Sequence, residues 1–248
     1  MPRKILGVIP ARFGSTRFPG KVLALVSSKT VLQHVYERAC QSRYLSDVII
    51  ATDDDRVVRA ARGFGAPVRL TRTDHISGTD RVAEVAATEE ASIIVNIQGD
   101  EPLIDPAAID AAIQPVARAF GAVMATLKKK IEDPREIEDP NVVKVVTNLV
   151  GDAIYFSRCA IPYARETGAA WFKHIGLYVY QRDFLLGYSQ LLVGPLERAE
   201  KLEQLRALEN GYAIQVGETD YDSLGVDTPE DLERVSRLFA KSILQGVN

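Results

Sequence analysis

Near its start the chain reads Ile5-Leu6-Gly7-Val8-Ile9-Pro10-Ala11-Arg12-Phe13-Gly14-Ser15-Thr16-Arg17-Phe18-Pro19-Gly20-Lys21. The apolar run 5–9 predicts a buried strand, and a loop with two glycines, two hydroxyls and three cationic side chains follows it. Small residues let backbone N–H groups approach a ligand, and the cations supply charge for an anion such as a triphosphate. Because α/β proteins bind ligands at the carboxyl ends of strands, we interpret this segment as a phosphate-binding loop. A flexible surface turn is the alternative.

Two familiar phosphate loops do not fit this stretch. A Walker A loop has four residues between its glycines and then Lys and Ser or Thr, whereas five residues separate Gly14 from Gly20 and Val22 follows the lysine. Gly14 belongs to no dinucleotide fingerprint G-x-G-x-x-G, and Gly63-Phe64-Gly65 is expected to end a helix rather than to begin one. The sequence therefore predicts a different kind of nucleotide loop.

The composition is that of an ordinary globular enzyme. With 248 residues, the chain is long enough for one sizeable α/β domain over residues 1–248. Hydrophobic residues make up 46% and charged residues 25%, which argues against disorder. The net charge of −3 gives no support for a nucleic-acid partner, which usually shows as a basic domain.

Cysteines and histidines indicate neither a disulfide framework nor a zinc site. Cys40 and Cys159 are far apart, and His34, His75 and His174 have no zinc-ligand spacing. No apolar run reaches the length of a membrane span, and the N-terminus has no long apolar segment with a cleavage site. We therefore expect a cytoplasmic protein without membrane insertion.

The first half of the chain predicts alternating strands and helices. Short apolar runs at 5–9, 48–51 and 93–97 are typical of parallel strands that are buried on both faces. Helical patterns begin after Thr30 and after Asp105, each a suitable N-cap. This repetition predicts an α/β fold with an open, doubly wound, mainly parallel sheet.

The second half departs from that pattern. The segment 128–141 is charged and contains two prolines, so we expect a surface stretch in which Lys128–Lys130 are solvated. Apolar runs at 142–147 and 153–156 predict a hairpin, and an extended segment at 171–180 completes an antiparallel insertion over about 141–182. Apolar residues at every third position over 196–208 predict one helix, which Gly211 closes, and a last helix is expected after Asp227.

Two acidic residues are candidates for a metal site. Asp100 lies in the turn 98–102 directly after an apolar strand, although turns favour these residue types on structural grounds as well. Asp227 precedes Thr228, which can cap the last helix in a capping box with Asp231, so the Asp227 carboxylate is left available. Two carboxylates suit Mg²⁺, which takes one or two of them together with substrate phosphates and water. Their spacing alone does not show that they meet.

Other polar residues have structural explanations. Ser77 and Asp80 predict a capping box, which is compatible with an anion at the same helix N-terminus. Exposure to solvent would account for the pair Glu203-Gln204, and strand alternation would account for His174 and Tyr178.

Together these motifs resemble the 3-deoxy-manno-octulosonate (Kdo) cytidylyltransferases, also called CMP-Kdo synthetases. The resemblance runs in order along nearly the whole chain, through the segments Ile9–Arg12, Ser15–Arg17, Pro19–Lys21, Ala51–Asp53, Thr71–Arg72, Asp74–His75, Ser77–Thr79, Val95–Pro102, Tyr155–Arg158, His174–Tyr178, Leu202–Arg206 and Gly225–Asp231. The combination is specific. The opening loop alone is shared loosely with other nucleotidyltransferases, and sialic acid activators usually lack Pro-Gly before the lysine and the Q-G-D-E-P turn.

The resemblance implies a fold, a reaction and a set of site residues. The fold is expected to be a Rossmann-like nucleotidyltransferase sheet with a small antiparallel region through which two copies form a homodimer. The reaction would join CTP and Kdo to give CMP-Kdo and pyrophosphate for lipopolysaccharide assembly, with Mg²⁺ as cofactor. Arg12, Lys21, Asp100 and Asp227 would be catalytic, with the two aspartates on the metal. The nucleotide would contact Ala11, Arg12, Ser15, Arg17, Lys21, Arg72, Ser77 and Gln98. The sugar acid would contact Gln98, His174, Tyr178, Glu203 and Gln204.

Three departures from the family pattern and two alternative functions remain open. Phe18 stands where Leu is common, Val22 where Pro is common, and the turn Ser27-Ser28-Lys29 lacks the usual glycine. Activation of 8-amino-Kdo or another keto sugar acid is the nearest alternative, and a non-catalytic nucleotide-binding protein on the same fold is an alternative of another class. No residue is identified as a general base.

Overall fold

The computed structural model describes residues 3–15, 17–118 and 122–244, so Thr16 of the N-terminal loop lies outside the described residues. The chain divides into two compact units, Met1–Ile109 with Ser223–Asn248 (unit 1) and Asp110–Asp222 (unit 2). The insertion expected at about 141–182 lies within unit 2, and a single domain over 1–248 stays a prediction. Among the described residues, no helix combines the length and the apolar character needed to span a membrane.

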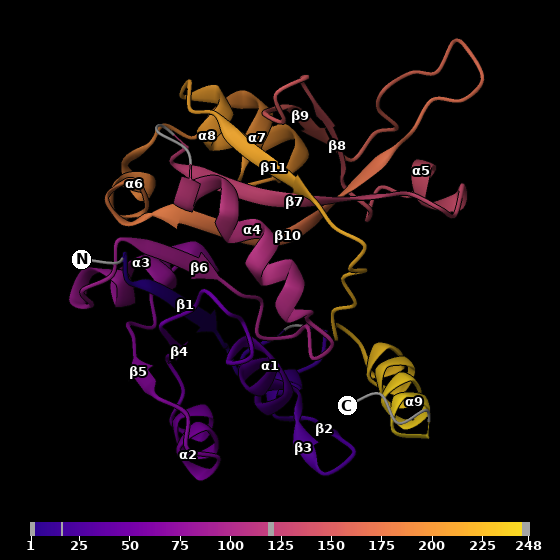
Figure 1. Ribbon diagram of the computed structural model, residues 1–248. Helices are drawn as coiled ribbons and strands as arrows, with labels where there is room; N and C mark the ends of the chain where they lie inside the picture. Colours follow the sequence, from indigo (N-terminus) through magenta and orange to yellow (C-terminus); the bar gives the residue numbers. More distant parts are fainter. Residues whose placement is uncertain (1–2, 16, 119–121, 245–248) are drawn as a thin grey trace. The chain divides into compact units, whose positions relative to one another are not determined.

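Unit 1 is built on a parallel sheet with the strand order β6-β1-β4-β5 (Figure 1). The strand β1 (Ile5–Pro10) pairs with β4 (Asp47–Thr52) on one side and with β6 (Ile93–Asn96) on the other, and β4 also pairs with β5 (Val68–Leu70). Val8, Ile50 and Ile94 of the central strands are fully buried, as expected for strands covered on both faces. The three predicted parallel strands are confirmed.

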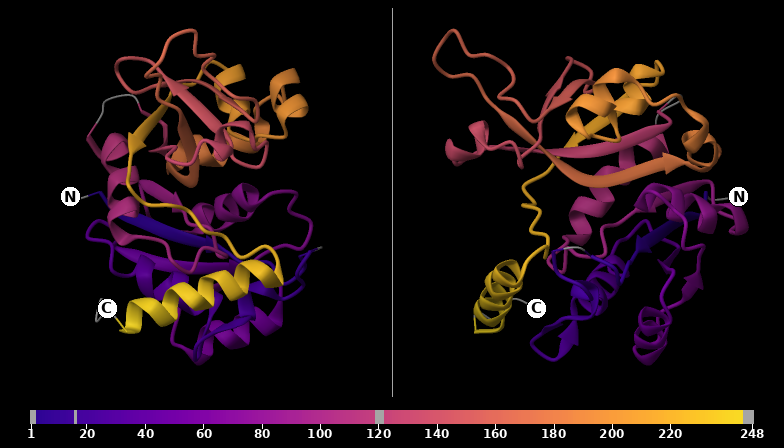
Figure 2. Two further views of the ribbon diagram at one scale, coloured as in Figure 1. Left: turned by 90° about the vertical axis from the view of Figure 1, so that its right-hand side faces the viewer. Right: turned by 180° about the vertical axis from the view of Figure 1, so that it is seen from behind.

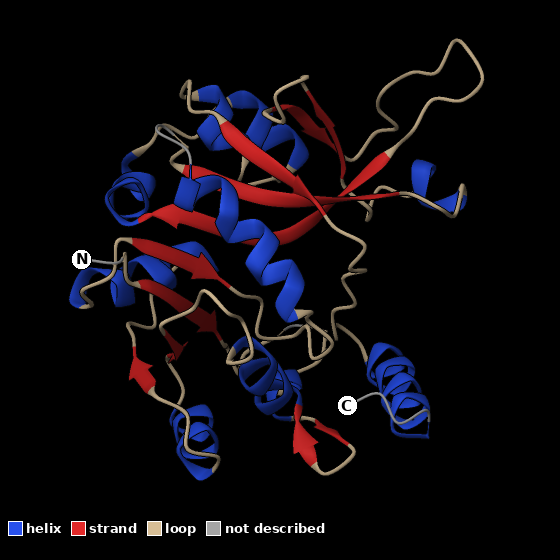
Figure 3. Ribbon diagram, in the orientation of Figure 1, coloured by secondary structure: helices blue, strands red, loops and turns tan. Residues whose placement is uncertain are grey.

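Three helices wind this sheet in two directions (Figure 3). The helices α1 (Val31–Ala39) and α2 (Asp55–Gly63) lead the chain from β1 to β4 and then to β5, whereas α3 (Gly78–Thr88) leads it back past β1 to β6. Because crossovers between parallel strands are right-handed, this reversal places α3 on the face opposite α1 and α2. The fold is therefore doubly wound as predicted, and its direction changes between β1 and β6. Ligand sites in such sheets lie at the carboxyl ends of the strands at this point.

The helix starts follow from local hydrogen bonds that the sequence indicated. The Thr30 side chain accepts from the Gln33 amide at 3.1 Å at the start of α1. The Asp105 carboxylate accepts from the Ala107 amide at 2.9 Å at the start of α4 (Pro106–Arg118), a helix that spans the boundary between the units. Both predicted N-caps are confirmed.

A short hairpin separates the N-terminal loop from α1. After the 3₁₀ helix η1 (Lys21–Leu23), the strands β2 (Leu25–Val26) and β3 (Lys29–Thr30) pair in an antiparallel manner through Ser27 and Ser28. Ser27 has φ 56°, in the left-handed region where glycine is favoured. The glycine expected in this turn is therefore missing at a position whose backbone favours it.

The last helix, α9 (Pro229–Leu244), belongs to unit 1 (Figure 2). Its Val235 joins Val26, Val31 and Val226 in a fully buried cluster, and Phe18 of the N-terminal loop packs against this cluster. The same apolar core therefore anchors the loop after β1 and the segment that carries Asp227.

Unit 2 contains the antiparallel strands (Figure 1). The strand β10 (Phe172–Gln181) pairs with β7 (Met124–Lys130) and with β8 (Lys144–Thr147), and β8 forms a hairpin with β9 (Ala153–Ser157). The strand β11 (Ile214–Glu218) runs parallel to β7. The predicted hairpin and the strand at 171–180 are confirmed. The unit also contains the short helices α5 (Arg135–Glu138), α6 (Arg182–Gly187), η2 (Tyr188–Gln190), α7 (Pro195–Glu200) and α8 (Leu205–Glu209).

The single helix predicted over 196–208 is wrong. Lys201 has φ 55° and ψ 44° and closes α7, and its amide donates to the Glu197 carbonyl at 2.9 Å. A spacing of three residues drifts by about 60° per step around a helix of 3.6 residues per turn, so five such residues cannot share one face. The break lets Leu202 and Leu205 be buried while Leu196 stays exposed.

The expectation that Lys128–Lys130 are solvated is wrong for Lys128 and Lys129, which are half-buried, and correct for Lys130, which is exposed. These residues end β7, where the Lys128 ammonium donates to the Thr147 hydroxyl at 2.9 Å and Lys129 pairs with Asp222 at 3.3 Å. The Lys129 side chain is mostly covered. Its partner lies far away in sequence, so local composition gives no sign of the pairing.

Candidate active site

The N-terminal loop turns back on itself and delivers Lys21 to the start of η1. The Gly20 amide donates to the Phe13 carbonyl at 2.8 Å, and Gly20 has φ 77°. A Cβ at this position would lie 2.9 Å from the Phe13 ring. The positive φ therefore favours glycine here, a Cβ would displace the Phe13 ring, and the turn sets the direction in which Lys21 leaves the loop.

Lys21 brings the two acidic candidates together. Its ammonium forms ion pairs with Asp100 and with Asp227, the latter at 2.7 Å, and Arg17 pairs with the second Asp227 oxygen at 2.8 Å. The Val226 amide donates to the Asp100 carbonyl at 2.8 Å, so the two backbone segments are also joined directly. Asp100 and Asp227, which the sequence could not show to meet, therefore contact the same nitrogen atom.

The electrostatics of this cluster favour its charged form. Burial by itself lowers the pKa of Lys21 and raises that of Asp227, because it disfavours charge. The contacts of Lys21 with Asp100 and Asp227 outweigh burial and raise its pKa above the ordinary lysine value. Lys21 and Arg17 likewise hold the pKa of Asp227 below the ordinary value. At neutral pH Lys21 is therefore an ammonium and Asp227 a carboxylate.

This geometry fits a divalent cation. Two carboxylates that reach one nitrogen atom can also reach one metal ion, and Mg²⁺ accepts one or two protein carboxylates with phosphate and water oxygens. Within the described ranges, no group of three or more His, Cys, Asp or Glu side chains gathers as a metal site. Asp100 and Asp227 would therefore hold the ion together with substrate oxygens, and Lys21 would leave the carboxylates for the phosphates.

Close backbone approach positions Asp100. A Cβ on Gly99 would lie 2.7 Å from the Pro10 carbonyl oxygen, so the turn lies directly against the end of β1. Because the obstacle would be backbone, which cannot rotate away, glycine is needed at this position. Gln98 lies in the same turn and is half-buried.

The other nucleotide candidates lie around the same strand end of unit 1. The Arg12 guanidinium donates to the carbonyls of His75 at 2.7 Å and Ser77 at 3.1 Å. Ser77 forms the predicted capping box with Asp80, with both bonds at 3.1 Å. Arg72 is exposed and its guanidinium pairs with Asp74 at 2.7 Å. The loop, the segment 72–77 and the N-terminus of α3 are thus linked through Arg12.

Ala11 and Ser15 make contacts that shape the backbone of the loop. Ala11 is buried, and its amide donates to the Ala51 carbonyl at 2.8 Å, which prolongs the pairing of β1 with β4. The Ser15 hydroxyl accepts from the Phe18 amide at 3.4 Å and shapes the loop. Neither contact points to a ligand by itself.

The predicted sugar residues form a second group within unit 2. His174 and Tyr178 are four residues apart on β10, with ring centres 5.4 Å apart. The Tyr188 hydroxyl donates to the Glu203 carbonyl at 2.8 Å. Burial raises the pKa of the Tyr178 phenol well above its ordinary value, and Tyr188 and Glu203 add to this. Tyr178 is therefore a neutral hydroxyl at physiological pH.

Solvent exposure does not account for Gln204. Its side chain is 4% exposed, directly before α8, so the interpretation of Gln204 as a solvated residue is wrong. Glu203 beside it is half-buried. Gln204 is buried because residues 202–204 form the connection between the two short helices α7 and α8 and do not continue one exposed helix.

His174 is a neutral side chain with a defined tautomer. Burial lowers its pKa to about 3. Its Nε2 lies 2.9 Å from the Thr126 hydroxyl, whose one hydrogen is in reach of the carbonyls of Ile175 at 3.0 Å and Leu177 at 2.9 Å, at an irregularity in the pairing of β7 and β10. Because the hydroxyl hydrogen is used on a carbonyl, the hydroxyl accepts from Nε2–H, and Nδ1 keeps its lone pair. His174 can therefore accept a hydrogen bond from a substrate hydroxyl through Nδ1.

Sequence reasoning missed the residues that support these groups. Arg81 is fully buried on α3, where it pairs with Asp53 at 2.7 Å and donates to the Thr71 hydroxyl. Glu84, one turn further along α3, pairs with His75. The signal in the sequence that could have pointed to Asp53, Thr71 and His75 is their place in segments that carry the family resemblance. Their partners on α3 looked like ordinary helix-surface residues in the sequence.

Comparison with known proteins agrees with this arrangement. A family model described as Cytidylyltransferase matches residues 6–216. A protein of Solibacter usitatus named 3-deoxy-manno-octulosonate cytidylyltransferase is 74% identical over 249 residues, which cover 100% of this chain and 99% of that protein. The chain belongs to the 3-deoxy-manno-octulosonate cytidylyltransferase family. The resemblance inferred from the motifs is confirmed.

Other members of the 3-deoxy-manno-octulosonate cytidylyltransferase family match almost as completely. One from Syntrophotalea carbinolica is 55% identical, over 93% of this chain and 96% of its own length. A solved structure of a CMP:2-keto-3-deoxy-manno-octonic acid synthetase complexed with CTP has a TM-score of 0.93 at 46% identity, covering 96% of this chain and 99% of that one. The α/β fold predicted from the sequence is therefore that of a cytidylyltransferase.

Proposed function

We propose that this protein is a Mg²⁺-dependent cytidylyltransferase that joins CTP and Kdo to give CMP-Kdo and pyrophosphate. The observation that carries the proposal is the meeting of Asp100 and Asp227 at Lys21, beside the loop that follows β1. A pair of carboxylates next to a cationic loop at a strand end is suited to a metal-bound triphosphate. The names of the relatives and the CTP complex of a similar structure support the same substrates.

The chemistry is a substitution at phosphorus. The anomeric hydroxyl of the sugar attacks the α-phosphorus of CTP in line and gives up its proton to water, the bond from the α-phosphorus to the bridging oxygen breaks, and pyrophosphate leaves. Arg12 and Lys21 neutralise the charge that develops on the phosphoryl oxygens, which requires cations that are already in place. Mg²⁺, held by Asp100 and Asp227, would act as a Lewis acid on phosphate oxygens. Ala11, Ser15, Arg17, Arg72, Ser77 and Gln98 would line the nucleotide site.

The sugar acid would be held by the group in unit 2. With Nε2 of His174 used on Thr126, Nδ1 could accept a hydrogen bond, the Tyr178 hydroxyl could donate one, and Glu203 and Gln204 offer further polar groups. Several hydrogen-bonding groups on a half-buried surface suit a polyhydroxylated ligand, because each substrate hydroxyl needs a partner when it leaves water.

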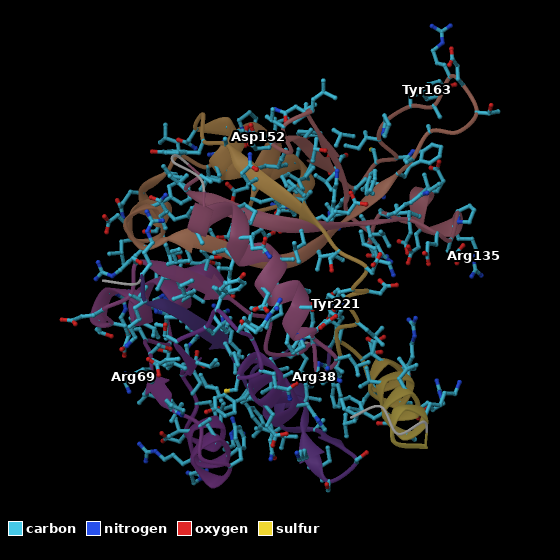
Figure 4. All side chains as sticks on the ribbon, viewed as in Figure 1. Arg38, Arg69, Arg135, Asp152, Tyr163 and Tyr221 are labelled. Carbon is cyan, nitrogen blue, oxygen red and sulfur yellow. The ribbon has the colours of Figure 1, made fainter. Side chains whose placement is uncertain are left out.

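The cellular setting belongs to the same proposal. We place the protein in the cytoplasm as a homodimer that supplies an activated sugar for lipopolysaccharide synthesis. Exposed apolar residues on and near the hairpin β8–β9, Leu149, Val150 and Ile154, support a contact between copies in this region. The loop that follows β9 extends away from the strands of unit 2 and carries the exposed Tyr163 (Figures 1 and 4).

A pyrophosphate-release assay tests the function. With CTP and Mg²⁺, release should require Kdo or a near analogue, and ATP or UTP should not replace CTP. Equal rates with N-acetylneuraminic acid would contradict the assignment to Kdo. A faster reaction with 8-amino-Kdo would favour that sugar. Nucleotide binding without turnover on any sugar acid would indicate a non-catalytic nucleotide-binding protein.

A further inference from the structure

The Arg12 guanidinium is held by neutral groups. It donates to the carbonyls of His75 and Ser77, and among the described residues no carboxylate forms an ion pair with it. Arg17 and Lys21 of the same loop are both paired with acids. A guanidinium that is fixed by carbonyls keeps its full charge for an incoming anion, while its orientation is already set. The position of Arg12 therefore depends on the position of the segment 75–77.

That segment is held by Glu84 of α3. The Glu84 carboxylate pairs with His75 Nε2 and also accepts from the Arg72 amide at 3.1 Å. The His75 side chain is mostly buried, so its pairing with Glu84 is little disturbed by water. Burial raises the pKa of Glu84, but the contacts with His75 and Arg72 outweigh burial and lower it, so that the side chain is ionised at neutral pH.

A second contact of α3 involves residues that precede the segment 75–77. Arg81, one turn earlier than Glu84, is fully buried and contacts Thr71 and Asp53, which lie directly after β5 and β4. Glu84 instead contacts His75, whose carbonyl accepts the hydrogen bond from Arg12. Of the two, it is Glu84 that connects the helix to the cationic loop.

We propose that Glu84 is a positioning residue for the triphosphate. Through His75 it fixes the carbonyls that orient Arg12, and Arg12 then contacts the phosphates of the nucleotide. The proposal rests on the proposed function, in which Arg12 binds the triphosphate of CTP. It implies that loss of the Glu84 charge weakens binding of the phosphates and leaves binding of the nucleoside unchanged.

Four variants separate this role from a general structural one. Glu84→Gln removes the charge but keeps an oxygen for the Arg72 amide, and Arg12→Ala removes the cation that Glu84 is proposed to position. The double variant tests their coupling. Glu89→Gln is the matched control, because Glu89 also forms an ion pair, with Arg69 at 2.8 Å, but at the C-terminal end of α3.

The measurement is the affinity for CTP with Mg²⁺ and for cytidine, with thermal unfolding to check folding. Glu84→Gln should weaken CTP binding roughly tenfold, the scale of one charge-assisted hydrogen bond, with cytidine binding unchanged. The double variant should bind CTP no more weakly than Arg12→Ala, and Glu89→Gln should bind as wild type. If Glu84→Gln does not fold, His75→Ala replaces it with the same expected results.

Two results would overturn the proposal. One is equal weakening of CTP and cytidine binding by Glu84→Gln, and the other is full additivity of the Glu84 and Arg12 effects on CTP. If Arg12→Ala alone binds CTP as wild type does, Arg12 does not bind the triphosphate. That result would overturn the proposed role of Arg12, and the role of Glu84 in positioning Arg12 would fall with it.

Discussion

At the scale of single residues, the centre of the site is one cation between two anions. The Lys21 side chain is only 13% exposed, so its contacts with Asp100 and Asp227 are better shielded from water than surface ion pairs are. Removing the ammonium leaves two carboxylates facing each other, whose mutual repulsion favours a replacement cation. Lys21 therefore has two expected effects, one on the nucleotide and one on the metal.

The first prediction is that Lys21→Ala lowers kcat/KM for CTP by about 100-fold, because one cation near the phosphoryl oxygens is lost. Mg²⁺ binding without nucleotide should become tighter, because no ammonium competes for Asp100 and Asp227. Lys241→Ala is the control, since Lys241 is an exposed lysine on α9 of the same unit. Steady-state kinetics and a Mg²⁺ titration measure the two effects. Similar kinetic constants for the two variants would show that Lys21 is not on the triphosphate.

The second prediction concerns His174 and pH. The pKa of His174 is about 3 in the folded protein and near 6.5 in an unfolded chain. Between these values the unfolded state binds a proton that the folded state does not, so stability contributed by neutral His174 is complete above pH 6.5 and is lost as the pH falls towards 3. The free energy of unfolding of wild type should therefore fall more steeply from pH 7 to pH 4 than that of His174→Gln. Parallel curves for the two proteins would contradict the prediction.

At the scale of elements, capping residues and strand runs were reliable signals. Thr30, Asp105 and Ser77 mark helix starts where the structure has them, because an N-cap is a local hydrogen bond that needs no distant partner. The two errors lie where distant partners decide. Lys129 is covered because Asp222 reaches it, and the helix over 196–208 is interrupted at Lys201, which lets Leu202 be buried.

The third prediction concerns the hairpin β2–β3. Among the described residues other than glycine, only Ser27 and Lys201 have a positive φ. Ser27→Gly should stabilise the protein by about 0.5–1 kcal/mol, since the relief of left-handed strain exceeds the entropy that glycine loses on folding. For a chain of this size the melting temperature should rise by about 1–4 °C. Ser28→Gly, at the neighbouring position, should lower it. A gain from Ser28→Gly and none from Ser27→Gly would contradict this account.

At the scale of the whole molecule, the sequence predicted the residue classes of the site but not their convergence. Asp100 follows β6 and Asp227 precedes α9, and only the folded unit 1 brings both to Lys21. The burial of Gln204 in unit 2 could not be predicted from local sequence either, because it depends on the break between α7 and α8. The family resemblance supplied these residues because a family pattern records the result of folding, which local patterns do not.

The fourth prediction is that the protein is a homodimer through the antiparallel region of unit 2. Ile154→Glu, at a position 61% exposed on β9, should weaken the dimer roughly tenfold or more, because a charge would be buried in an apolar contact. Leu70→Glu is the control, at a position 63% exposed on β5 of unit 1. Light scattering over a range of concentrations measures the dissociation. A wild-type protein that is monomeric and fully active at micromolar concentration would contradict the dimer.

The central claim is that Asp100 and Asp227 hold one Mg²⁺ ion for nucleotidyl transfer. The most direct test is kcat as a function of Mg²⁺ concentration for Asp100→Asn, Asp227→Asn and the double variant, with Asp105→Asn as control. Asparagine keeps the shape of aspartate but not its charge, so circular dichroism should show intact folds.

Each single site variant should lose about 100-fold or more in kcat at limiting Mg²⁺ and recover in part at high Mg²⁺. The double variant should be little worse than the worse single one, because both residues serve one ion. If Asp227→Asn folds and reaches the wild-type rate at limiting Mg²⁺, Asp227 is only the residue before α9, and the proposed metal site is wrong.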